Sequence, residues 1–110
     1  MKTICVPLTT EAMELLDTND CPSSLLESTT LTEEEYQELL KSGALESIND
    51  ASGKILDEYE DEFINTPEEL DKTLKILKTY LRPENSKTLN KLIKLNVLAI
   101  NKNTGLFFFF

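Results

Sequence analysis

SKTLNKLIKLNVLAINKNTGLFFFF, residues 86–110, places a helix, a helix stop and an apolar strand in one continuous run. The helix is expected to open near Ser86 and to turn its apolar residues inward, namely Leu89, Leu92, Ile93, Val97 and Ile100. Residues 103–105 (NTG) are typical of a helix end. Residues 106–110 then form the predicted last strand, with the phenylalanines buried rather than displayed as a docking tail.

The other end of the chain supplies a matching segment. Residues 3–8 (TICVPL) are β-like, and pairing with residues 106–110 would bury both apolar termini. With helical signals between them, the sequence predicts a mainly α (α+β) fold, a compact helical domain with a small sheet formed by the N- and C-terminal segments. No linker or repeat divides residues 1–110, so a single domain is expected.

Two internal helices are predicted from their start signals. Thr32 with Glu35 three residues later forms a capping box, and Gly43 provides a left-handed stop after about Ser42. Thr66 precedes Pro67 at the first helical position. The second of these helices carries an apolar stripe that ends before Pro83, made of Leu70, Leu74, Leu77 and Leu81.

In the segments before and between these two helices the signals are weaker. Thr10 is the expected cap of a short helix through Leu16, and residues 19–24 read as a loop. Within residues 44–64, a helical turn around Ile48 and a helix after Gly53 are compatible with the pattern. Helix and strand remain alternatives for this segment.

Charge is strongly uneven along the chain. The 110 residues hold 20 Asp and Glu against 11 Lys and Arg, a net charge of -9. Residues 1–53 carry -9, residues 54–70 carry -6, and residues 71–110 carry +6. This composition disfavours binding to a phosphate backbone and favours a basic protein partner.

The sequence lacks residues on which several kinds of site depend. With no histidine, the Ser/His and Cys/His pairs and mixed Cys/His zinc sites are excluded. Cys5 and Cys21 fit two reduced thiols. No apolar run approaches the roughly 18 residues of a membrane span. We therefore expect a cytoplasmic protein that is not an enzyme, with no catalytic residue, cofactor or metal, and no nucleic acid or membrane as partner.

The densest functional signal is the run Asp57-Glu58-Tyr59-Glu60-Asp61-Glu62, with five acids in six residues. On a helix these acids would include like-charge pairs four residues apart, which destabilise. A solvated face is the ordinary explanation, and a partner-facing patch is the alternative that we adopt as the prediction. Placing Gly53 at position 6 of a calcium loop leaves Ile48 and Tyr59 at its ends, so the EF-hand pattern fails.

A basic counterpart follows in the C-terminal helices, made of Lys72, Lys75, Lys78, Arg82, Lys87, Lys91 and Lys94. Only Tyr80 is interleaved among these cations, which disfavours a nucleic-acid face. We expect solvated faces that pair with acids of the N-terminal half.

Residues 46–49 (ESIN), 55–64 (ILDEYEDEFI) and 103–108 (NTGLFF) resemble short acidic immunity proteins of bacterial contact-dependent inhibition and related polymorphic toxin systems. The resemblance implies a non-enzymatic cytoplasmic antitoxin, monomeric before complex formation, that blocks the active site of a cognate basic toxin domain, often a nuclease. The alternative is an acidic adaptor, or a DNA-mimic anti-repressor that binds a DNA-binding regulator. A small carboxylate enzyme is disfavoured because adjacent exposed acids lack contrasting environments.

Overall fold

A computed structural model of the chain describes residues 2–53 and 61–110. The helices are α1 (Thr10–Asp17), α2 (Glu33–Ser42), α3 (Ala44–Ser52), α4 (Pro67–Tyr80) and α5 (Ser86–Lys102). The strands are β1 (Lys2–Pro7), β2 (Leu26–Leu31), β3 (Asp61–Ile64) and β4 (Leu106–Phe109). Single 3₁₀ turns lie at Ser23–Leu25 and Pro83–Asn85. The predicted mainly α (α+β) class is confirmed.

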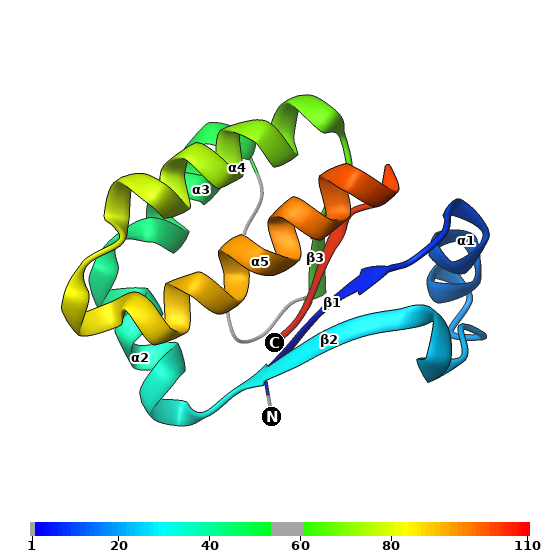
Figure 1. The fold of residues 1–110 in the computed structure, drawn as a ribbon, viewed down its shortest axis with the longest axis horizontal. Coiled ribbons are helices and arrows are strands. Elements are labelled where there is room, and N and C mark those ends of the chain that lie inside the picture. Colours follow the sequence, from blue (N-terminus) through cyan, green and yellow to red (C-terminus); the bar gives the residue numbers. More distant parts are fainter. Residues whose placement is uncertain (1, 54–60) are drawn as a thin grey trace.

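The sheet is antiparallel with strand order β2-β1-β4-β3. Helices α2 to α5 gather over one of its sides, while α1 stands apart near one end of β1 and β2 (Figure 1). The predicted pairing of the two terminal segments is correct, because β1 and β4 are neighbours with Ile4 opposite Phe108. The apolar ends of the chain therefore form the centre of the sheet.

Alternation along the strands gives the sheet two different sides. Ile4, Val6 and Phe108 face the helices, and each is at most 1% exposed. They pack with buried leucines of α2, α4 and α5, including Leu39, Leu77 and Leu92. The other side, which we call the open face, carries Phe107 and Phe109 in β4.

Local signals explain where the helices begin and end. Thr32 and Glu35 form the predicted capping box, and Gly43 ends α2 with φ 85°. Thr66 caps α4 by accepting a hydrogen bond from the Glu69 backbone N–H, and Pro67 is its first residue. Asn103 ends α5 in the left-handed conformation.

Three details of the sequence interpretation were wrong. Thr9, not Thr10, caps α1, and its Oγ1 accepts a hydrogen bond from the Ala12 backbone N–H at 3.0 Å. Val97, expected inside, is 39% exposed, because the buried stripe of α5 runs through Leu95 and Ala99 instead. Strand β2 was not predicted.

The segment whose structure was left open is now partly assigned. Residues 44–52 form α3, and residues 61–64 form strand β3. A helix starting after Gly53 therefore does not continue to Phe63. Leu56 and Tyr59, expected on the same helical face, lie outside the described residues.

Candidate functional site

The open face of the sheet holds a partly exposed aromatic cluster. Phe107 lies directly opposite Phe63 of β3, so both side chains leave the sheet on the same side. Their rings stack with centroids 5.7 Å apart and an interplanar angle of 25°. Phe63 is 40% exposed, and Phe107 and Phe109 are half-buried. Such a cluster on a sheet surface is a feature of protein interfaces.

Acidic side chains border this cluster. Glu14 and Asp17, three residues apart on α1, line a hollow of about 240 Å³ together with Phe63 and Phe107. Both acids are exposed. From the opposite direction, Asp61 of β3 lies opposite Phe109 and is also exposed. A basic side chain entering the hollow would meet carboxylates beside an apolar surface.

We call this set the acid–aromatic face. Its members come from α1, β3 and β4 and are Glu14, Asp17, Asp61, Phe63, Phe107 and Phe109. The sheet register positions the β3 and β4 residues, and α1 reaches the same side through the short connection that follows β1 (Figure 1).

The predicted acidic run contributes to this face only in part. Asp57, Glu58, Tyr59 and Glu60 lie outside the described residues. Asp61 belongs to the open face. Glu62, next along β3, is opposite the buried Phe108 and therefore projects toward the helices. Its Oε1 accepts a hydrogen bond from the Phe63 backbone N–H at 3.2 Å.

Sequence reasoning missed the remaining members of the face. Glu14 and Asp17 gave no signal, because two acids on a short exposed helix are ordinary, and only the fold brings them to Phe63. Phe107 and Phe109 were expected to be buried with their neighbours. Strand alternation in 106–109 could have indicated that every second aromatic leaves the core.

No protein-family model, curated protein or solved structure matches this chain.

The Cys5 thiol does not have the properties of a nucleophile. Cys5 lies in β1 and is 3% exposed, and burial raises the pKa of its thiol to about 11, with a smaller contribution from Cys21. A thiol with this pKa is protonated at neutral pH, and the thiolate is the reactive form. Both cysteines are free.

Two further features are absent from residues 2–53 and 61–110. No group of three or more His, Cys, Asp or Glu side chains there is arranged to hold a metal ion. Across the same residues, none of the helices has the length and apolar character needed to cross a membrane.

Within residues 2–53 and 61–110, two lysines of α4 and α5 form ion pairs. Lys91 forms an ion pair with Glu35 of α2 at 2.6 Å, as expected for a contact with an N-terminal acid. Lys75 instead pairs with Asp71 of its own helix at 3.1 Å.

Proposed function

We propose that this chain is an immunity protein of a bacterial toxin system, a cytoplasmic antitoxin that binds one cognate basic toxin domain and blocks its active site. The observation that carries the proposal is the acid–aromatic face, in which Phe63 and Phe107 stack beside Glu14, Asp17 and Asp61. The net charge of -9 supports the same kind of partner.

The two components of the face have different physical roles. Aromatic side chains supply contact area whose removal from water stabilises a complex, and hot spots are surrounded by residues that exclude water. The carboxylates attract a basic surface and accelerate encounter. A nuclease toxin fits this pattern because it carries Lys and Arg to hold phosphates, and an inhibitor that occupies them excludes the substrate.

The predicted run at 57–62 extends this proposal beyond the described residues. Asp61 belongs to both the run and the acid–aromatic face. The other residues of the run, Asp57, Glu58, Tyr59 and Glu60, directly precede the edge strand β3 in the sequence. We assign partner binding to the run and the face together.

The test uses the product of the gene immediately upstream, which the proposal expects to contain the toxin domain. One variant combines Asp57→Asn, Glu58→Gln, Asp61→Asn and Glu62→Gln. A second combines Glu14→Gln, Asp17→Asn and Phe63→Ser. Each should weaken binding to the toxin domain at least tenfold and reduce protection of cells that express the toxin. Neutralising the run should also flatten the salt dependence of affinity.

A matched control removes three exposed charges elsewhere, with Glu46→Gln, Asp50→Asn and Glu84→Gln. It should bind and protect as the original protein does. If both test variants bind and protect like the control, the acid–aromatic face and the run are solvated surfaces and the proposal fails. Capture of a DNA-binding regulator, with no effect on the upstream gene product, would favour the acidic adaptor instead.

A further inference from the structure

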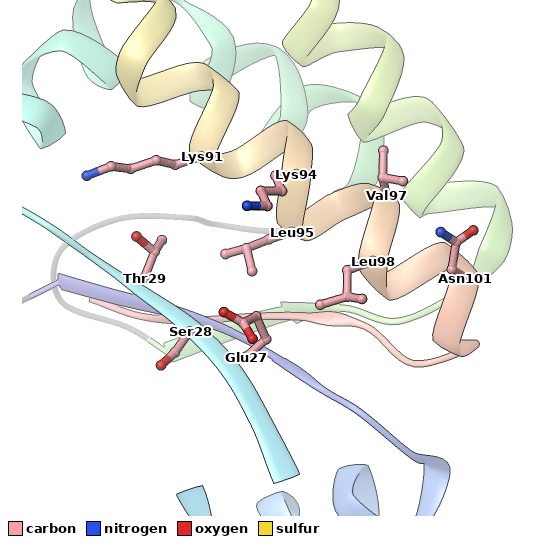
Figure 2. A pocket seen from close by; sticks show the side chains of 9 residues that line it. All are labelled: Glu27, Ser28, Thr29, Lys91, Lys94, Leu95, Val97, Leu98 and Asn101. Carbon is pink, nitrogen blue, oxygen red and sulfur yellow. The ribbon is translucent and has the colours of Figure 1, made fainter. Parts of the chain in front are cut away.

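A second surface lies on the opposite edge of the sheet, where a groove of about 510 Å³ separates β2 from α5. Leu95 and Leu98 point from α5 toward β2, and Lys91 extends past Thr29 (Figure 2). Leu98 is half-buried, and neighbouring Val97 is 39% exposed. The groove therefore combines an apolar floor with polar walls.

The strand along this groove is an unprotected sheet edge. Strand β2 pairs with β1 on one side only, and within the described residues no strand pairs with its other side. Its sequence, LESTTL, contains no Pro or Lys that would blunt the edge, and its one charged residue is Glu27. The other edge strand, β3, carries Asp61 and Glu62 in four residues and repels a copy of itself.

Two exposed side chains of opposite charge lie on the two walls of the groove. Glu27 on β2 and Lys94 on α5 are both exposed, and neither forms an ion pair within residues 2–53 and 61–110. Lys91 is already paired with Glu35. One free anion and one free cation on opposite walls make a surface that complements itself after a half-turn rotation.

We propose that a second copy of this chain occupies the groove, with β2 of each copy pairing antiparallel across a two-fold axis. Opposite residues of an antiparallel pair share a side of the sheet, so the axis must pass through a residue rather than between two. We place it at Ser28, which sets Leu26 opposite Thr30 and Glu27 opposite Thr29 of the other copy.

This register brings the free charges together. Glu27 would point to the helix side beside Thr29 of the second copy, where Lys91 and Lys94 line the same groove. The contact forms twice by symmetry. The two four-stranded sheets would become one sheet, and the acid–aromatic faces, on the other side, would stay exposed. The inference replaces the monomer expected from the sequence and is independent of the proposed function.

The first experiment measures molar mass by sedimentation over a range of concentrations. The chain of 12.5 kDa should associate to twice that mass. Glu27→Lys or Lys94→Glu alone should raise the dissociation constant at least tenfold, because like charges then oppose each other across the axis. The double variant, Glu27→Lys with Lys94→Glu, should restore association. The control Glu46→Lys makes the same charge change at an exposed position of α3 and should have no effect.

The second experiment tests the register by oxidation in a Cys5→Ala, Cys21→Ser background. Cys5 is removed because it lies opposite Ser28 within the same chain and would otherwise form an intramolecular disulfide with a cysteine at position 28. Ser28→Cys should give a disulfide-linked dimer, because residues facing each other across the axis have Cα atoms about 4.5–5.5 Å apart. Thr30→Cys should not crosslink to itself. A monomer at every concentration overturns the proposal. The proposal is also overturned if the protein dimerises but neither charge reversal changes the dissociation constant and Ser28→Cys gives no crosslink, because the interface then lies elsewhere.

Discussion

Among single residues, Glu35 links local and tertiary structure most directly. It is 7% exposed, and its Oε1 accepts a hydrogen bond from the Thr32 backbone N–H at 3.1 Å. Its Oε2 accepts one from Lys91 Nζ at 2.6 Å. The bond from Lys91, followed by that from Thr32, lowers the pKa of the carboxyl below its usual value. The capping role was predictable from four residues, whereas the partner 56 positions away was not.

Replacing Lys91 with Met should therefore destabilise the protein at neutral pH by about 2–4 kcal/mol, because a largely buried carboxylate loses its cation. The folded-state pKa of Glu35 is lowered, so its contribution is present above the unfolded pKa and is lost as pH falls through the folded pKa. The difference between the variant and the original should shrink in acid. Urea unfolding at neutral and acidic pH measures both effects.

The control for this variant is Lys75→Met, which removes an exposed pair with Asp71. Exposed pairs contribute about 0–1 kcal/mol, so this change should have little effect at either pH. Equal losses in the two variants would contradict a special role for the Glu35–Lys91 pair.

At the scale of elements, α1, α2, α4 and α5 were predictable, whereas α3 was left open and the two edge strands were not predicted. Helix ends depend on neighbouring residues such as Thr32, Gly43 and Thr66, which act within one turn. Strand β2 has two leucines in six residues, and β3 is half acidic, so neither shows an apolar pattern. Edge strands are only half covered, and their pairing with β1 and β4 comes from distant residues.

The junction between α5 and β4 gives a prediction at this scale. A Cβ on Gly105 would lie 2.8 Å from both the Ile64 carbonyl oxygen and Asn65 Cβ. Backbone atoms cannot move aside easily, so Gly105→Ala should push β4 away from the end of β3. We expect a loss of about 3 kcal/mol of unfolding free energy, measured by thermal or urea denaturation.

Gly53→Ala separates crowding from backbone conformation. Gly53 has φ 71°, and no atom of the described residues lies within 4 Å of the position its Cβ would take. Only the left-handed backbone conformation should therefore lower the unfolding free energy of Gly53→Ala, by about 1 kcal/mol. If Gly105→Ala proves no worse than Gly53→Ala, close packing against β3 is not what selects glycine at 105.

For the whole molecule, the arrangement of the sheet depends on contacts across nearly the full sequence. Pairing of the terminal segments followed from their apolar character, and β1 lies beside β4 as predicted. The strand order and the division into a helix side and an open face did not follow, because both depend on packing. For the same reason Asp61 was the one predicted site residue that the described structure brings to the acid–aromatic face.

Because β4 pairs with both β1 and β3, removing it should affect the entire fold. A chain ending at Gly105 loses Leu106 and Phe108, each 1% exposed, and leaves β1 and β3 without their shared neighbour. The lost burial is roughly 5 kcal/mol, comparable with the whole stability of a small domain. Cooperative thermal melting, followed by circular dichroism, should disappear.

Single substitutions test which side of β4 carries this stability. Phe108→Ala should lower the unfolding free energy by about 3–5 kcal/mol, whereas Phe109→Ala, which removes a half-buried side chain on the open face, should lower it clearly less. A truncated chain that melts like the complete one would show that the helices form the core without β4.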